Sequence, residues 1–213
     1  EIARDKAHVA PEDAPLVTAA HDVTDVLSES SPILTVGGED DDVVVESKGR
    51  RNHVEQEIEI RGPGFHVQTR IPHLGPRQAE NAGIAAALSR QVVEVSELDI
   101  GRGLRKADWP GRFEILGYEP LVILDGAHNP GAVENLSEAM DEFEYDDLYL
   151  VFGAMHDKDH RTMIETLPRP DHVITTRPDE ERAEDEGVLA AVFAAAGVES
   201  RDRIQAVPAA LEN

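Results

Sequence analysis

The chain has 213 residues, which is enough for one large domain or for two small domains with cores of their own. It carries 43 Asp and Glu against 20 Lys and Arg, a formal net charge of −23, and no cysteine. This composition excludes disulfides and thiolate metal sites, and it argues against nucleic acid as a partner because no broad basic face can form. No apolar run approaches membrane-spanning length, so no membrane partner is expected.

The acids are spread along the whole length rather than gathered in a tail. This pattern is typical of a salt-adapted cytoplasmic protein of a halophile, in which high ionic strength screens the repulsion between acids. An ordinary acidic protein is the alternative. The chain starts without Met, in what reads as the middle of a helix, and we interpret it as a piece of a longer protein.

The first half is predicted to begin with a helix end, a short strand at 15–18 and a further helix before residue 30. Turns that contain Gly and Pro separate the strands that follow. These strands are expected at 33–36, 43–45, 54–60 and 65–71. Two helices are then expected, an Ala-rich one at 76–90 and a second at 96–106 with acids in its first turn.

After Trp109 the pattern becomes an alternation of strands and helices. Strands are expected at 112–118, 121–125, 147–152 and 171–175 and near Ile204, and helices at 131–142, 159–167 and 183–196. This alternation predicts an α/β fold with a parallel or mixed sheet and helices on its faces. We therefore expect two domains, residues 1–108 and residues 109–213.

The most informative segment is the apolar run Leu121–Leu124 with the turn Asp125-Gly-Ala-His-Asn-Pro130 after it. A buried strand that leads through a tight turn into a helix is the place where open α/β sheets bind ligands. Pro130 suits the first turn of that helix, where its missing N–H would be unpaired in any case. A reversal at 117–120 would make 112–118 and 121–125 antiparallel neighbours, so that their far ends meet at one sheet edge.

Five segments, in this order along the chain, resemble the folylpolyglutamate and dihydrofolate synthases of the Mur ligase superfamily. They are Arg4-Asp-Lys-Ala7, Gly75-Pro-Arg-Gln-Ala-Glu-Asn-Ala82, Trp109-Pro-Gly-Arg112, Asp125-Gly-Ala-His-Asn-Pro130 and Phe152-Gly-Ala-Met-His-Asp-Lys-Asp159. The resemblance implies that residues 1–108 end the central ATPase domain of such a ligase. Residues 109–213 would form its Rossmann-like C-terminal domain, with helices on both faces of a mostly parallel sheet, truncated near Ala206.

In these ligases ATP phosphorylates a substrate carboxylate, and an amine attacks the acyl phosphate that results. The resemblance therefore implies an ATP-dependent carbon–nitrogen ligase that uses ATP and Mg²⁺ to add L-glutamate to a folate or to dihydropteroate. It also implies a monomer that works in the cytoplasm. The physical task is to position the reactants and to neutralise phosphate charge.

By resemblance, Lys6 is the lysine that CO₂ carbamylates, which turns a cation into an oxygen ligand for Mg²⁺ and gives it a catalytic role. The alternative is a surface lysine at a helix end. Asn81 would contact the adenine, or else form a hydrogen bond near a helix start. Arg112 would reach ATP phosphate, or else form a surface salt bridge.

Asp125 would bind ribose hydroxyls or a metal-bound water, and His128 would help to hold the nucleotide and take part in catalysis, again by resemblance. The alternatives are a helix cap for Asp125 and a packed neutral ring for His128. Asn129 is predicted to serve the turn rather than a ligand. His156, Asp157 and His160 mimic a metal cluster, but we expect no metal there, and Asp159 suits an N-cap.

No Gly-Lys-Ser or Gly-Lys-Thr occurs in the chain, so it lacks the G-x-x-x-x-G-K-[ST] loop of the family. That loop and the first Mg²⁺ ligands of the family would lie upstream of Glu1. We therefore expect the chain to be inactive alone and covalently continuous with an upstream P-loop domain. Two rival hypotheses remain: a Mur-type ligase for cell-wall precursors, and a non-catalytic nucleotide-binding module.

Overall fold

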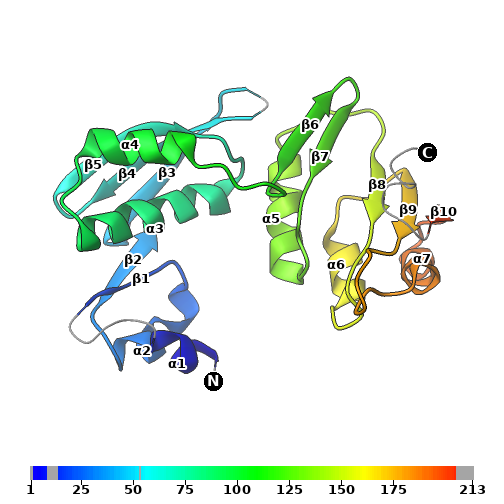
Figure 1. The fold of residues 1–213 in the computed structure, drawn as a ribbon, viewed down its shortest axis with the longest axis horizontal. Helices are drawn as coiled ribbons and strands as arrows, with labels where there is room; N and C mark the ends of the chain where they lie inside the picture. The colour runs from blue at the N-terminus through cyan, green and yellow to red at the C-terminus, as the bar shows by residue number, and fades with distance from the viewer. Residues whose placement is uncertain (1, 9–13, 53, 205–213) are drawn as a thin grey trace. The chain divides into compact units, whose positions relative to one another are not determined.

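The computed structural model describes residues 2–8, 14–52 and 54–204 (Figure 1). The chain forms two compact units, Glu1–Leu124 and Asp125–Asn213, each with its own hydrophobic core. The division falls later than the predicted boundary after Asp108, because a β-hairpin that follows this residue is grouped with the first unit. The expected truncation near Ala206 lies outside the described residues.

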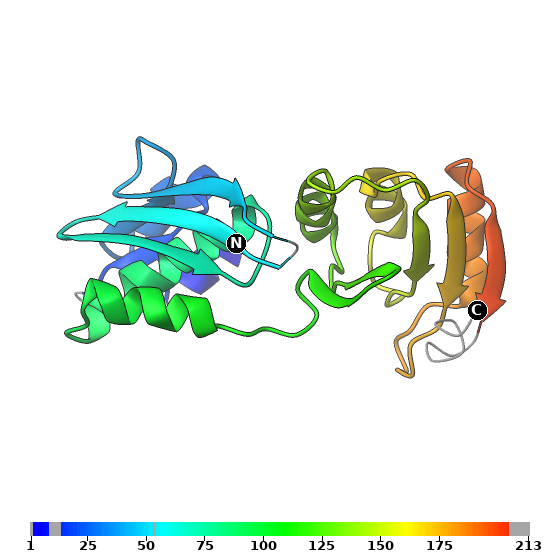
Figure 2. The same cartoon turned by 90° about the horizontal axis from the view of Figure 1, so that it is seen from above.

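The first unit is built on a five-stranded sheet in the order β1-β2-β3-β4-β5 (Figures 1 and 2). Its strands are β1 (Leu16–Thr18), β2 (Ile33–Gly37), β3 (Val43–Arg50), β4 (Gln56–Gly62) and β5 (Phe65–Ile71). The first three strands are parallel, whereas β3, β4 and β5 are antiparallel neighbours. Each predicted strand of this half is confirmed, and β3 is longer than expected.

Alternate residues of β4 and β5 are buried, so this part of the sheet has one apolar and one polar face. The apolar face packs against α3 (Pro76–Val92) and α4 (Glu97–Lys106). The buried positions of α3 are small, Ala79, Ala82, Gly83, Ala86 and Ala87, so its backbone can approach the sheet closely. Both helices are confirmed, and Ser96 caps α4 by accepting a hydrogen bond from the Asp99 N–H at 3.2 Å.

Three short helical segments complete the N-terminal part of the first unit. They are α1 (Ile2–Ala7), the 3₁₀ turn η1 (His21–Val23) and α2 (Thr24–Ser28). α1 contacts α2, and Ala7 and Leu27 are buried.

A two-stranded ribbon, β6 (Glu114–Tyr118) with β7 (Leu121–Leu124), closes the first unit. The strands are antiparallel and Glu114 pairs with Leu124, which confirms the predicted reversal between them. β6 begins two residues later than expected. The reason is that Gly111 and Phe113 have φ of 70° and 49°, a left-handed conformation that a strand cannot contain.

The second unit contains a parallel sheet in the order β10-β9-β8, so the predicted α/β class is confirmed. Its strands are β8 (Tyr149–Phe152), β9 (His172–Thr176) and β10 (Ser200–Ile204). Its helices are α5 (Pro130–Met140), α6 (His160–Thr166) and α7 (Glu186–Ala195). Among the described residues, α6 contacts both α5 and α7, so these helices form one layer beside the sheet.

Helix α7 begins three residues later than expected. The Asp185 side chain accepts hydrogen bonds from the N–H groups of Gly187 and Val188 at 2.8 and 3.3 Å, which makes Asp185 the N-cap. Ala183 is paired instead with Met155 in an isolated antiparallel bridge. No helix among the described residues is both long and apolar enough to cross a membrane.

Candidate functional site

The turn after β7 is held by hydrogen bonds among its own residues. Asp125 Oδ1 accepts from the Ala127 N–H at 2.7 Å, and Asn129 Oδ1 accepts from the Ala132 N–H at 2.9 Å. Asn129 is therefore the N-cap of α5, and Pro130 is the first residue of this helix, in the first turn as the sequence predicts. The alternative role expected for Asp125 is that of a helix cap. This expectation is met only in part, because its carboxylate accepts a hydrogen bond within the turn before the helix.

His128 is exposed, and its Nδ1 lies 2.9 Å from the Gly126 carbonyl oxygen. Since a carbonyl only accepts, Nδ1 carries the proton in this contact, and Nε2 of a neutral ring then keeps its lone pair. The ring is not packed in a core, so the alternative of a buried neutral histidine is wrong. Within the described residues Nε2 has no hydrogen bond, so this exposed ring can accept one from a ligand.

Arg112 precedes β6 at the end of the ribbon where Glu114 pairs with Leu124. Its Nη1 donates to the Gly111 carbonyl at 3.3 Å, and the neighbouring Phe113 is buried at 7% exposure. No ion pair of Arg112 is found within the described part of the chain, which disfavours the salt-bridge alternative. The predicted cluster of Arg112 with Asp125 and His128 stays a prediction, because these residues belong to different units.

Lys6 lies in the last turn of α1 with an exposed side chain, next to the buried Ala7. The amine is accessible to CO₂, as carbamylation requires. Asn81 is also exposed, but it is the sixth residue of α3 rather than its first. Its Nδ2 donates to Gln78 Oε1 at 3.2 Å, so the alternative of a bond to backbone is not observed.

The loops that follow β8 and β9 at the C-terminal edge of the parallel sheet are joined to each other. The His156 N–H donates to the Arg182 carbonyl at 2.8 Å, and the Glu184 N–H donates to the Ala154 carbonyl at 2.9 Å. The motif segment 153–159 is thus joined to residues 182–184 by an isolated antiparallel bridge, and these two paired loop segments are called the platform below. Asp159 caps α6 by accepting from the Thr162 N–H at 3.1 Å, which confirms its predicted local role.

Charges on this platform also interact locally. The Lys158 ammonium lies 3.2 Å from Asp157 Oδ2 and lowers the pKa of that carboxyl below its ordinary value. Hydrogen bonds from Thr162 lower the pKa of Asp159 in the same way. The described residues contain no group of three or more His, Cys, Asp or Glu that could hold a metal ion.

His160 is the residue of this region whose structural role the sequence analysis did not predict, because it is considered there only as part of a mimicked metal cluster. It is 9% exposed, and its Nε2 donates to the Met155 carbonyl at 2.8 Å, while Nδ1 lies 3.9 Å from Glu184 Oε2. His160 therefore contacts both loops of the platform. The signal was present in the sequence, because His160 shares the helical phase of the buried Met163 and Ile164.

Comparisons with known proteins agree with the resemblance. A family model described as "Mur ligase, glutamate ligase domain" matches residues 111–213. A Halobacterium salinarum protein named "Probable bifunctional folylpolyglutamate synthase/dihydropteroate synthase" is 53% identical over 99% of this chain. A protein of the same name from Haloferax volcanii is 47% identical over 91% of it. The chain spans only 26% and 24% of the length of these two relatives.

Two solved structures give the same result for the fold. A folylpolyglutamate synthase of Mycobacterium tuberculosis, complexed with ADP, superposes with a TM-score of 0.88 at 25% identity, over 99% of this chain and 50% of that one. One from Thermotoga maritima gives 0.71 at 28% identity, over 96% and 54%. Residues 111–213 therefore match the glutamate ligase domain of Mur ligases, and the sequence and fold of the chain are similar to those of folylpolyglutamate synthases.

Proposed function

We propose that this chain is part of an ATP-dependent ligase that adds L-glutamate to a folate. The observation that carries the proposal is the similarity over 99% of the chain to a protein whose name includes folylpolyglutamate synthase. The name of that relative contains two activities. The folylpolyglutamate synthase part belongs to the segment matched here, because the Mycobacterium tuberculosis structure carries that name alone and covers the same 99%.

The donor set fits ATP and a divalent metal such as Mg²⁺, which when bound would activate the substrate carboxylate by phosphorylation. Arg112 offers a planar fork for phosphate oxygens, and Asp125 a carboxylate for ribose hydroxyls. His128 presents a ring nitrogen to a ligand, and Asn81 an exposed amide to a base. Lys6 is accessible for carbamylation, after which its oxygens would suit Mg²⁺.

The same residues give the proposal its test in the full-length protein. We expect Arg112→Ala and Asp125→Ala each to raise the KM for ATP or to lower kcat about tenfold or more, the effect of losing one charged contact. Arg161→Ala is the matched control, because Arg161 is exposed in α6 and pairs with Glu165. Unchanged kinetics in both Arg112→Ala and Asp125→Ala would remove these residues from the nucleotide site.

Lys6→Ala is expected to lower turnover strongly in the full-length protein. Short carboxylic acids should restore part of the activity, because they supply the oxygen ligand that the carbamate would provide. Full activity of the variant without added acid would make Lys6 an ordinary surface lysine.

We also propose that the 213-residue chain does not ligate glutamate by itself, because its sequence contains no P-loop motif. Incubation with ATP, Mg²⁺, L-glutamate and either a folate or dihydropteroate, followed by mass spectrometry, tests this. A product heavier by one glutamate residue would contradict it. In the full-length protein, the same two acceptors decide whether dihydrofolate synthase activity accompanies glutamate addition to folates.

A Mur-type ligase for cell-wall precursors is the second candidate. A UDP-N-acetylmuramyl-tripeptide synthetase of Lactococcus lactis is 34% identical over 48% of the chain. The folate candidate is preferred because its relatives match nearly the whole chain at higher identity. A non-catalytic nucleotide-binding module is the third, and an active full-length protein would exclude it. The monomeric state, the cytoplasmic location and the halophilic source stay proposals, the last supported by the Halobacterium and Haloferax relatives.

A further inference from the structure

The polar face of β3, β4 and β5 differs in charge from the rest of the molecule. Although acids outnumber bases by 43 to 20 in the chain, basic side chains are as frequent as acidic ones on this face. The basic residues are Lys48, Arg51, Arg61 and Arg70, and the acidic ones are Glu46, Glu55, Glu57 and Glu59. Arg105 comes from the last turn of α4, a helix that packs against the opposite, apolar face. The face is therefore a local exception in an acidic protein.

Several basic side chains of this face are already paired with carboxylates of the same face. Glu59 lies at the centre, where its carboxylate contacts Lys48 Nζ at 3.0 Å, Arg61 Nη1 at 3.1 Å and His66 Nε2 at 2.7 Å. Lys48 also lies 2.6 Å from Glu46 Oε2. These cations have carboxylate partners within hydrogen-bond distance and have little left to offer a ligand.

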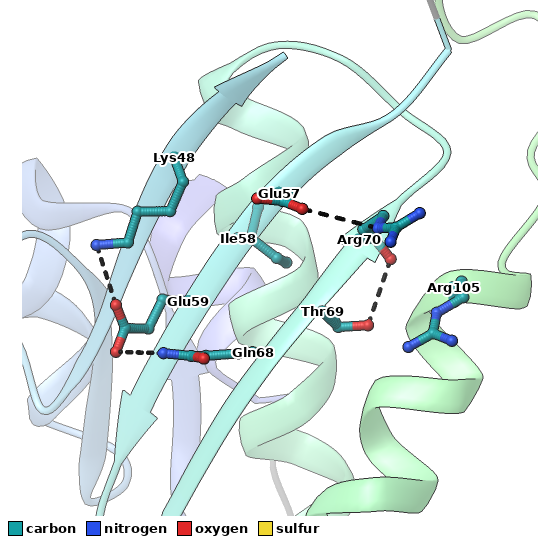
Figure 3. A pocket seen from close by; sticks show the side chains of 8 residues that line it. All are labelled: Lys48, Glu57, Ile58, Glu59, Gln68, Thr69, Arg70 and Arg105. Carbon is teal, nitrogen blue, oxygen red and sulfur yellow. Dashed lines mark hydrogen bonds and ion pairs between the residues drawn. The ribbon is translucent and has the colours of Figure 1, made fainter. Parts of the chain in front are cut away.

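An open groove of about 350 Å³ lies beside this cluster (Figure 3). It is lined by side chains or backbone of Lys48, Glu57, Glu59, Gln68, Arg70 and Arg105. The residues come from three different elements, β3, the hairpin β4–β5 and the end of α4, so only the folded unit assembles them. Figure 3 draws Arg105 on the helix beside the strand that carries Arg70, and Lys48 on a strand at the opposite side of the view.

The two arginines of the groove are less well paired than the other cations of the face. Arg70 lies 3.8 Å from Glu55 Oε2 and 3.8 Å from Glu57 Oε1, beyond hydrogen-bond distance in both cases. Arg105 has no hydrogen bond or ion pair within the described residues. The helix macrodipole accounts for a base in the last turn of α4, but not for its place beside a second guanidinium at a groove.

We propose that this groove binds a carboxylate-bearing small molecule through Arg70 and Arg105. A guanidinium fork matches a carboxylate with two parallel hydrogen bonds, and two forks suit a ligand with more than one carboxylate. At high salt such short contacts persist, whereas long-range attraction and repulsion are screened. The ligand is either a free dicarboxylate or the γ-linked glutamate tail of a product, and the second source rests on the proposed function.

Calorimetric titration of the 213-residue chain, without ATP, tests the proposal. The probes are tri-γ-L-glutamate, L-glutamate and inorganic phosphate at one constant KCl concentration. We expect tri-γ-L-glutamate to bind and Arg105→Ala to weaken it about tenfold or more, the effect of losing one charged contact. Arg102→Ala is the control, since Arg102 is in the same helix and pairs with Asp99 outside the groove. Circular dichroism checks the fold of both variants.

Each outcome of this titration either supports or contradicts the proposal. Tighter binding of the trimer than of L-glutamate supports the tail, and equal binding supports a free dicarboxylate. Phosphate binding as strong as that of the trimer would overturn the assignment to carboxylates. The proposal is also overturned if no probe binds, or if Arg102→Ala weakens binding as much as Arg105→Ala. Because no catalysis is measured, failure here leaves the ligase activity to its own test.

Discussion

The side chain of Glu59 stays ionised at pH values well below the ordinary pKa of a glutamate. Hydrogen bonds from Lys48, then from His66 and Gln68, lower the pKa of Glu59 to about 2. These donors lie on β3 and β5, the two neighbours of β4, and Gln68 is directly opposite Glu59 in the register. Cross-strand pairs of opposite charge therefore stabilise the association of β3, β4 and β5.

The pKa of Glu59 predicts how its contribution depends on pH. The folded value of about 2 lies below the ordinary 4.5, so the stabilisation is complete above about pH 4.5 and is lost as the pH falls towards 2. We expect Glu59→Gln to lower the thermal midpoint at neutral pH, and the difference from the parent to vanish near pH 2. Thermal melts across this range, with Glu57→Gln as the control, measure it. Equal pH dependence in both variants would contradict the prediction.

His160 connects two loops that are far apart in the sequence. Its side chain contacts Met155 in one loop and Glu184 in the other. We expect His160→Ala to destabilise the second unit by about 1–3 kcal/mol, because it removes a hydrogen bond and leaves the Met155 carbonyl without that donor. Amide exchange at His156 should accelerate, since its N–H bonds across the platform to Arg182. The exposed His156→Ala is the control, and an equal effect of both variants would remove His160 as the link.

At the scale of elements, α3 and α4 differ in how closely they approach the sheet. A Cβ on Gly83 of α3 would lie 2.8 Å from Val36 Cγ1 and still closer to Val45. A Cβ on Gly103 of α4 would meet nothing within 4 Å. Gly83 therefore allows close packing of α3 against the sheet, whereas Gly103 only lowers the stability of α4.

Two alanine substitutions should consequently have opposite signs. Gly83→Ala is expected to destabilise the first unit by about 1–3 kcal/mol, because the core cannot absorb the extra methyl group without strain. Gly103→Ala should stabilise it by about 0.5–1 kcal/mol through helix propensity. Chemical denaturation of the two variants beside the parent measures both. A loss of stability in Gly103→Ala would show that α4 is constrained at that position by more than its described contacts.

At the scale of the whole molecule, the net charge of −23 opposes the folded state through repulsion between the acids. Repulsion between acids weakens as salt shortens the screening length, so multimolar KCl should favour the folded state. We expect the thermal midpoint to be higher by about 4 °C or more in multimolar KCl than in low salt, the shift that about 1 kcal/mol gives. Sucrose at matched osmolality is the control for solvent exclusion. An unchanged midpoint would count against halophilic adaptation.

Local patterns in the sequence determined most elements and several of their ends. Asp159 caps a helix as predicted, and the helix expected from Ser96 and the turn role expected for Asn129 are both observed, because capping depends on a side chain and N–H groups only two or three residues away. The β6–β7 reversal was predictable for the same reason. The delayed starts of β6 and α7 were not, since they depend on left-handed φ values at Gly111 and Phe113 and on a bridge from Ala183 to a distant loop.

Strand order and the meeting of distant side chains were decided by the tertiary structure alone. Periodicity shows which residues of β4 and β5 face the core, but not that β1, β2 and β3 run parallel while β4 is antiparallel to both of its neighbours, β3 and β5. The sequence by itself determined the family motifs that contain Lys6, Asn81, Arg112, Asp125 and His128. The contacts of His160 with two loops and the groove with Arg70 and Arg105 came only from the fold, because contacts between residues far apart in the chain leave no local pattern.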